Sequence, residues 1–549
     1  MTTAPETRSN RIRGPVQDHY DAIVVGSGIG GLTTAALLAR RGGKQVLVLD
    51  QHYVAGGNAT SFRRKQFEFT VGLHYVGECG PGERIPRILE ACDVNDIEFL
   101  PMSDEVDTFH ASDGPGFKVP ATREQYRERL LEQYPDERRG VERYCRFLEQ
   151  ALVASQAEFG GSWWQKLLVP FRAPMVVRYM NRTAAEFIDS CTDDPELLTV
   201  FTAQSGAYCL PPSEVSVLLH TGLQNHYFSS GGWYPVGGGQ AMADGLAETI
   251  EAAGSDIRLR CDVREITVEN GRASGVVFDS KQLGTRRVTA PLVISNADIK
   301  KTVTELVGPQ HFPARFTRKI EHSEMTLPLF IAFLGLDFPP EELPFGNGNQ
   351  WMTDTIDIDK FYAGLHRGEV PEKPPILISS TSQKDPQNPR VAPPGQCNLE
   401  LLTAVPRKPE FWGVTEEQIV DGSYSTNPAY IEAKRAFGER CLDQAARLIP
   451  DIRDHVVFLE TASPMTQARY TRATDGGPYG LAALPSQFLG KRPGARSPLP
   501  GLFFCGASCR AGFGIMGSMT SGLYAAEAIL GGGIVRRVLH GEGFGSGPA

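Results

Sequence analysis

The stretch Tyr20-Asp-Ala-Ile-Val-Val-Gly-Ser-Gly-Ile-Gly-Gly31 decides the fold of this 549-residue chain. Its short apolar run, rich in β-branched residues, predicts a strand buried on both faces. The glycines at 26, 28 and 31 then allow a tight turn, a close backbone approach to a pyrophosphate, and close packing of the next helix. We expect that helix over residues 32–41, with its N-terminal amides facing the phosphates.

A second strand and an acid complete this pattern. Residues 45–50 form an apolar run that ends at Asp50, at the distance from Gly26 where a carboxylate holds the ribose hydroxyls of a dinucleotide. An acid at this place favours a free 2′-hydroxyl, and therefore FAD or NAD over NADP. A glycine-rich turn in an ordinary α/β domain would explain neither the order of these elements nor Asp50.

Two further glycine clusters bear on the cofactor. The doublet Gly56-Gly57 favours FAD over NAD, because the ribityl chain and ring of FAD need a second close backbone approach; the alternative is an ordinary turn. The stretch Gly512-Phe-Gly-Ile-Met-Gly517 lacks a following strand with a charged end. We interpret it as a helix start that approaches the flavin ring, with a second nucleotide site or a packing turn as alternatives.

Composition limits the class of protein. A chain with 41% hydrophobic and 22% charged residues is typical of a globular enzyme, and a net charge of −9 disfavours a nucleic-acid partner. The ten cysteines form no CxxC pair, which argues against a zinc site or a disulfide framework and fits a reducing cytosol. No apolar run approaches the roughly 20 residues of a membrane-spanning helix, so we expect a cytoplasmic protein.

The domain organisation is predicted to be discontinuous, because strands typical of the dinucleotide fold return late in the chain, the last of them near residues 500–506. A helix is expected after it, over residues 517–530. The predicted segments are a disordered leader (1–18), a FAD-binding domain (19–80, 232–305 and 460–535), a domain for substrate and membrane docking (81–231 and 306–459) and a flexible tail (536–549).

Four blocks make the chain resemble the phytoene desaturase-type flavoproteins, and most closely the branch of carotenoid isomerases and retinol saturase-like enzymes. These blocks are residues 24–31 with 56–57, residues 67–77, residues 232–239 and residues 498–507. The resemblance implies an α/β fold in which a discontinuous Rossmann-type FAD-binding domain joins an α+β substrate domain, as in amine oxidases.

The resemblance also implies which residues contact FAD. They are Gly26, Ser27, Gly28, Ile29, Gly30, Gly31, Asp50, Gln51, Gly56, Gly57, Asn58, Val263, Gly506, Ala507, Ile515 and Met516. Two positions depart from the common pattern. Asp50 replaces the more common Glu, which the ribose contact tolerates. Ala507 stands where many amine oxidases have an Asp, so backbone amides must make that contact.

The substrate implied by the resemblance is an apolar polyene or isoprenoid lipid, carotenoid- or retinoid-like. Its bonds offer no acidic proton, so hydride exchange with FAD carries the chemistry, as desaturation, saturation or isomerisation. The electron donor or acceptor stays open. His74 is the candidate proton donor, with packing beneath the flavin as the alternative. Tyr75 is a second candidate, although a place in the pocket wall is the favoured interpretation. The same role in the pocket wall is expected for Trp233, Tyr234 and Tyr479.

A basic and aromatic segment predicts membrane docking. Residues 159–185 contain no acid, and the residues expected at the membrane are Trp163, Trp164, Lys166, Phe171 and Arg172. The alternative is a core helix of the substrate domain, and the prolines at 170 and 174 interrupt any long helix. Docking would place the protein on the inner face of the membrane.

Two other functions fit the same fold. An amine or amino-acid oxidase would need a polar or aromatic cage for the amine. A non-enzymatic carrier of prenylated proteins would lack the phosphate-binding glycines, which this chain keeps.

Overall fold

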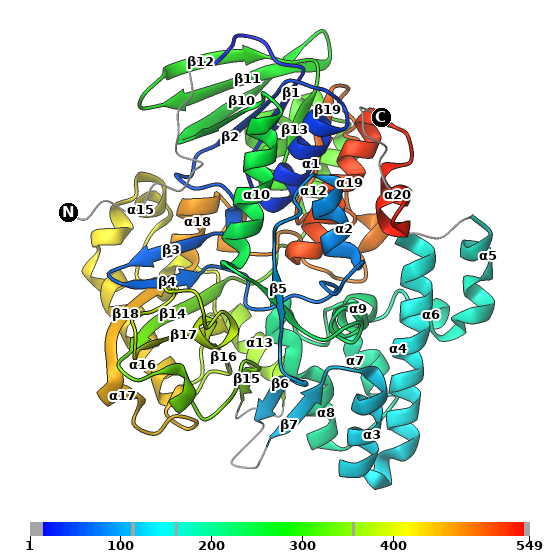
Figure 1. The fold of residues 1–549 in the computed structure, drawn as a ribbon, viewed down its shortest axis with the longest axis vertical. Coiled ribbons are helices and arrows are strands. Elements are labelled where there is room, and N and C mark those ends of the chain that lie inside the picture. Colours follow the sequence, from blue (N-terminus) through cyan, green and yellow to red (C-terminus); the bar gives the residue numbers. More distant parts are fainter. Residues whose placement is uncertain (1–14, 111–115, 160–162, 354–356, 543–549) are drawn as a thin grey trace.

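A computed structural model describes residues 15–110, 116–159, 163–353 and 357–542 of the chain (Figure 1). Within this part, the strands fall into two large sheets and three small ones. One large sheet lies towards the top of the view and the other towards the lower left, while an arm of helices extends to the lower right. The chain passes several times between these regions, and this repeated crossing positions the functional site.

The first large sheet is a parallel five-stranded sheet of order β19-β13-β1-β2-β9. It consists of β1 (Ala22–Val25), β2 (Val46–Asp50), β9 (Asp256–Leu259), β13 (Val293–Ser295) and β19 (Leu502–Phe504). Strands from early, middle and late parts of the sequence therefore meet in one sheet. This arrangement confirms the predicted α/β fold with a discontinuous Rossmann-type sheet.

The side chains of β1 and β2 alternate between two hydrophobic cores, as the period of two in a strand requires. Ala22 and Val24 face the core formed with α1 (Ile29–Arg40), α10 (Gly238–Ala252) and α19 (Gly514–Leu530). Ile23 and Val25 face the opposite core. That core is covered by an antiparallel meander of β10 (Cys261–Glu269), β11 (Arg272–Ser280) and β12 (Gly284–Thr289). Both faces are covered, which explains the continuous apolar run in the sequence.

The second large sheet has seven strands in the order β18-β14-β17-β16-β15-β6-β7. It consists of β18 (Val456–Ala462), β14 (Leu329–Leu336), β17 (Cys397–Ala404), β16 (Ile376–Ser379), β15 (Asn349–Met352), β6 (Glu105–His110) and β7 (Phe117–Pro120). All neighbours pair antiparallel except β15 and β6. The strand β18 spans the boundary predicted between residues 459 and 460. The predicted domain boundaries stay predictions.

The helical arm lies between β7 and β8 (Trp233–Pro235) in the sequence. Its main helices are α3 (Arg123–Gln133), α4 (Arg138–Phe159), α5 (Trp163–Arg172), α6 (Pro174–Tyr179), α7 (Ala184–Ile188), α8 (Pro195–Thr202) and α9 (Val217–Tyr227). Their apolar faces pack in one core with β6, β7 and part of β14. The arm is therefore joined to the seven-stranded sheet rather than to the parallel sheet.

A hairpin of β3 (Ser61–Arg64) and β4 (Phe67–Thr70) carries the chain from the parallel sheet to the seven-stranded sheet. Phe67 and Phe69 stack on Phe458 of β18, with ring centroids 6.1 and 5.7 Å apart. Phe67 also fills the space above Gly335 of β14. The residues directly after this hairpin, 71–77, are thereby held between the two sheets.

Three local predictions need correction. The first helix begins at Ile29, three residues before the predicted start, because Gly30 and Gly31 already lie inside it. The helix expected from residue 517 begins at Gly514. The predicted flexible tail (536–549) overlaps α20 (Ile534–His540), whose Ile534, Val535 and Val538 pack against the helical face of the parallel sheet. Residues 1–14 and 543–549 lie outside the described part of the chain.

All ten cysteines are free thiols, and all but Cys191 are buried. Burial raises the pKa of most of these thiols, including Cys79, Cys92 and Cys441. Among the described residues, no helix combines the length and the hydropathy needed to cross a membrane.

The contact between Phe67 and Gly335 tests how the hairpin is attached to the sheet. A Cβ on Gly335 would lie 2.4 Å from the Phe67 ring, so Gly335→Ala should destabilise the fold by about 1–3 kcal/mol. The measurement is the melting temperature of the variant. Gly346→Ala is the matched control, because a Cβ at that exposed glycine meets nothing within 4 Å. Equal melting temperatures for both variants would contradict this packing.

Candidate active site

The first cavity relevant to function has a volume of about 650 Å³ and lies at the carboxyl ends of the parallel strands, where open α/β sheets bind ligands. The predicted cofactor residues that line it are Gly26, Gly28, Ile29, Gly30, Asp50, Gln51, Gly56, Gly57, Asn58, Val263, Gly506, Ala507 and Ile515. Ser27 and Gly31 lie behind this wall, and Met516 lines a different cavity. Most of the predicted set therefore surrounds one cavity.

The two glycine turns are packed directly against each other. Gly28 and Gly56 form an isolated parallel bridge, and a Cβ on Gly57 would lie 3.0 Å from the Cα of Gly28. Gly57 also has a φ of +60°, a conformation that side chains with a Cβ disfavour. The doublet thus provides the second close backbone approach that the sequence predicts.

Asp50 is fixed by its neighbours at the end of β2. Its Oδ2 accepts hydrogen bonds from the Ser27 amide at 2.7 Å and the Ser27 hydroxyl at 2.6 Å, and its Oδ1 accepts one from the His52 amide at 2.8 Å. A carboxylate has about four acceptor positions, so one stays available for a hydroxyl in the cavity. Ser27 therefore supports the acid from behind.

Asn296 is a cavity residue that the sequence reasoning missed. It follows β13 and lies among the glycines, since a Cβ on Gly28 would meet its Nδ2 at 2.6 Å and a Cβ on Gly506 its Oδ1 at 2.7 Å. The sequence did contain a signal for Asn296, because it is a polar residue directly after an apolar strand of the Rossmann sheet. Asn58 is fixed similarly, donating to the Pro478 carbonyl at 3.0 Å and accepting from Gln467 at 2.6 Å.

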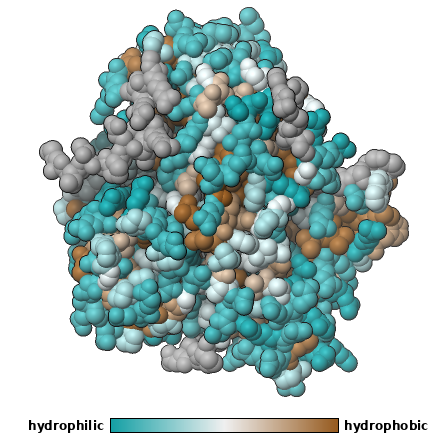
Figure 2. Space-filling view, in the orientation of Figure 1, coloured by the Kyte–Doolittle hydropathy of each residue, from teal (hydrophilic) through white to brown (hydrophobic). Residues whose placement is uncertain are grey.

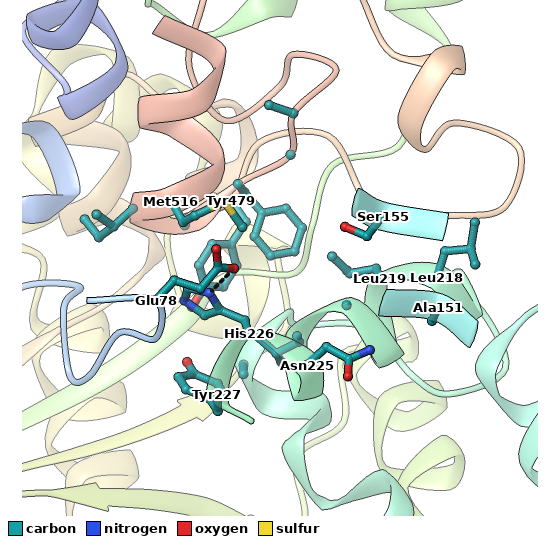
Figure 3. Close-up of a pocket in the computed structure, with 18 of the residues that line it drawn as sticks. Glu78, Ala151, Ser155, Leu218, Leu219, Asn225, His226, Tyr227, Tyr479 and Met516 are labelled. Carbon is teal, nitrogen blue, oxygen red and sulfur yellow. Dashed lines mark hydrogen bonds and ion pairs between the residues drawn. The ribbon is translucent and has the colours of Figure 1, made fainter. Parts of the chain in front are cut away.

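The second cavity is larger, about 1070 Å³, and most of its wall is apolar. Its walls come from α4, α6, α9, the seven-stranded sheet and the start of α19. Figure 3 shows part of this wall, with Leu218 and Leu219 of α9 and the hydrogen bond between His226 and Glu78. Tyr75 and Tyr227 stack within it, with ring centroids 4.3 Å apart. This shape and polarity suit an elongated apolar ligand.

The two cavities meet. Seven residues line both of them, namely Gly72, His74, Leu329, Leu402, Tyr479, Gly514 and Ile515. The first turn of α19 is therefore directed at the junction, and its amides and dipole favour negative charge there. A cofactor that extends along the first cavity would bring its far end to this junction, where a ligand in the second cavity can contact it.

His74 stands at this junction with a buried, unsatisfied side chain. It is 9% exposed, and neither ring nitrogen has a hydrogen-bond partner. Its Nδ1 lies 3.7 Å from Oε2 of Glu400, a fully buried carboxylate oxygen that also lacks a hydrogen bond. If His74 only packed beneath the flavin, its ring nitrogens would be expected to have hydrogen-bond partners. In the structure, both nitrogens lack such a partner.

Tyr75 has a different environment. Its hydroxyl donates to Oδ2 of Asp107 at 3.2 Å, and burial raises the pKa of the phenol well above its usual value. Because its only proton is used in this bond, Tyr75 suits the cavity wall better than proton transfer.

The predicted pocket aromatics separate into two groups. Tyr479 lines both cavities. Trp233 and Tyr234 line neither, because β8 pairs with β5 (Phe99–Pro101) and directs Tyr234 into the core beside Met242 and Ala243. The sequence predicted both residues as pocket walls, but it does not show which face of a short strand is buried.

These residues fit FAD. The paired glycine turns leave a surface that a Cβ would fill, Asp50 keeps one acceptor position, and the starts of α1 and α19 both line the first cavity. The fold and the site together define a dinucleotide-binding flavoprotein.

The family follows from comparison with known proteins. The family described as flavin containing amine oxidoreductases matches residues 29–394 and 426–530. The chain belongs to this family of FAD-dependent oxidoreductases, and FAD is its cofactor.

Curated relatives belong to the branch that the sequence resembles. All-trans-retinol 13,14-reductase of Danio rerio is 29% identical, with 96% of this chain and 88% of that protein aligned. Prolycopene isomerase 1 of an Oncidium hybrid cultivar is 26% identical, with 93% and 84% aligned.

Solved structures share the fold. An oxidoreductase from Methanosarcina mazei has a TM-score of 0.59 at 19% identity, covering 92% of this chain and 99% of its own. Cyclohexylamine oxidase from Brevibacterium oxydans has a TM-score of 0.57 at 15% identity, covering 94% and 99%.

The contact between the glycine turns yields a test of FAD binding. Gly57→Ala should weaken FAD binding about tenfold or more, since 1.4 kcal/mol of clash with the Gly28 backbone corresponds to a factor of ten. The measurement is the dissociation constant of FAD from the purified protein.

Gly43→Ala is the matched control for this variant. Gly43 has nearly the same φ, +57°, but a Cβ there meets nothing within 4 Å. This control should bind FAD like the wild type. Equal losses in both variants would show that backbone strain, rather than the approach of the turns, causes the effect.

Proposed function

We propose that this flavoprotein acts on the C–C or C=C bonds of an apolar polyene or isoprenoid lipid, retinoid- or carotenoid-like. The observation that carries the proposal is the junction at which the large apolar cavity meets the FAD-binding cavity, between His74 and Tyr479. Relatives named for retinol reduction and prolycopene isomerisation support the same substrate class.

The residues of the second cavity hold the polyene and exclude water. Leu329 and Leu402 at the junction and Leu218 and Leu219 in the wall provide apolar contacts along an extended chain. Bound FAD supplies hydride exchange with the substrate. His74 is the junction residue proposed to transfer a proton, because both nitrogens of its imidazole lack a hydrogen-bond partner.

The direction of the reaction is tested with the FAD-loaded protein under anaerobic conditions. Bleaching of oxidised flavin by an added carotenoid indicates desaturation, whereas turnover of retinol or of a cis-carotenoid only after prior reduction indicates saturation or isomerisation. Amine oxidation with peroxide release and no polyene turnover would overturn the proposal. For the active polyene, His74→Gln should lower kcat about 100-fold while FAD stays bound, because a proton donor is lost.

We further propose that α5 and α6 dock on an anionic membrane surface. Phe171, Leu167 and Trp164 are 81%, 63% and 49% exposed, and Lys166, Arg172 and Arg178 provide positive charge beside them. Hydrophobic surface on this arm is visible at the right of Figure 2. The side chain of Trp163 lies outside the described residues. Basic and apolar side chains together favour the interface of anionic lipid.

This surface is continuous with the second cavity. Val169 of α5 and Val176 and Val177 of α6 line the cavity, as does Met180 after α6. A lipid substrate could thus pass from the bilayer to the junction without crossing water, which would cost free energy in proportion to its apolar area. Location on the inner face of the membrane stays a prediction.

The double variant Leu167→Ser/Phe171→Ser tests docking. It should lose most binding to vesicles that contain anionic lipid, measured by co-sedimentation, because two exposed apolar anchors are removed. Ile431→Ser is the control, since Ile431 is 53% exposed on α16 (Pro428–Ala445), outside the arm. Unchanged binding by the double variant, or an equal loss in the control, would contradict the assignment of this surface.

A further inference from the structure

A buried group of charges lies behind His74. Lys384 of α14 (Thr381–Lys384) is 3% exposed and donates to the His74 carbonyl at 2.7 Å, to Oδ1 of Asn349 at 2.5 Å and to the Ser379 hydroxyl at 2.6 Å. Burial lowers its pKa to about 8, so the ammonium stays protonated at neutral pH. The backbone of His74 is therefore anchored by a buried cation.

Asp107 forms the opposite side of this group. Burial raises its pKa, but its oxygens accept from Tyr75, Gln204, Asn349 and Trp351, and four donors favour the carboxylate form. Asp107 is thus satisfied by hydrogen bonds.

Glu400 is not satisfied to the same extent. Its Oε1 accepts from the Thr381 hydroxyl at 3.2 Å, while Oε2 faces Nδ1 of His74 at 3.7 Å and lacks a hydrogen bond. Tyr234 is a further titratable neighbour, and burial raises the pKa of its phenol so that it stays neutral. Two more carboxylates lie around this phenol, and both have partners of their own: Asp385 accepts from the Gly237 amide and from Asn388, and Glu68 pairs with Arg390.

Among the four residues His74, Lys384, Asp107 and Glu400, the charges balance only if His74 is protonated. Lys384 provides one positive charge against the carboxylates of Asp107 and Glu400, and a buried unpaired charge is costly. A second positive charge at His74 would bring the sum to zero. The missing partner of Oε2 is then the Nδ1–H of an imidazolium.

We propose that Glu400 is a positioning residue that holds His74 as an imidazolium, with Nδ1–H towards Glu400 and Nε2–H available at the junction of the two cavities. This inference rests on the proposed function of His74 as proton donor. As the Nε2–H bond breaks, its electron pair stays on the imidazole, and the proton forms a C–H bond with the π-electron pair of the substrate double bond, whose other carbon would take a hydride supplied by reduced FAD. Nδ1 keeps its proton, so the pair with Glu400 persists.

The first experiment needs no substrate. Histidine-labelled, FAD-loaded protein is examined by ¹⁵N NMR at pH 7, with the His74 signal assigned by its loss in His74→Gln. His74 should be an imidazolium in the wild type and neutral in Glu400→Gln, a variant that keeps the size of the side chain but removes its charge. The same protonation state in both proteins would overturn the proposal, whatever the substrate proves to be.

The second experiment measures turnover of the polyene found active. Glu400→Gln should lower kcat about 100-fold with little change in KM or FAD content, and Glu400→Asp should recover part of this loss. In the double variant with His74→Gln, removing Glu400 should cause no further loss, because both act through one proton. Independent, additive losses would show that Glu400 acts on stability instead.

Thr381→Val is the matched control for these measurements. It removes the hydrogen bond to Oε1 of Glu400 but leaves both the charge and the face towards His74. This variant should keep the imidazolium. A neutral His74 in Thr381→Val would show that any disturbance of the buried group has the same effect, and would overturn a specific role for the carboxylate.

Discussion

The contact between the backbones of Gly28 and Gly57 constrains the rest of this site. Because no side chain separates the two turns, the second turn packs directly on the start of α1, and the chain that follows it is aimed towards the seven-stranded sheet. The hairpin β3–β4 then attaches to β14 and β18 through Phe67 and Phe69, which fixes residues 71–77 between the sheets. His74 owes its place at the junction to these two attachments.

The protein combines an apolar cavity with buried charge, two features with opposite energetic requirements. The leucines and aromatic residues of the cavity wall stabilise the fold by removing apolar area from water. The buried Lys384, Asp107 and Glu400 cost free energy unless each charge is paired or hydrogen-bonded. Their hydrogen bonds reach the backbone of His74 and the start of β15 at Asn349, so the charges also order the segment that faces the cofactor.

The Rossmann sheet, Asp50 and the glycine turns could be predicted from the sequence because their signals are local: spacing, strand pattern and residues without a Cβ. The second cavity could not. His74, Lys384 and Glu400 are distant in sequence and meet only through strand pairing, and a lone acid within the apolar run of β17 was the one sign of Glu400. The sequence likewise could not show which face of β8 is buried, which decides the place of Tyr234.

The burial of the cysteines has a consequence for an enzyme with a reducible cofactor. Reduced flavins that meet oxygen release peroxide, which attacks thiolates rather than thiols. Burial keeps most of these side chains protonated, and Cys505 and Cys509, on either side of Gly506 at the FAD-binding cavity, follow this rule. Burial of these thiols in the fold thereby makes them poor targets for peroxide.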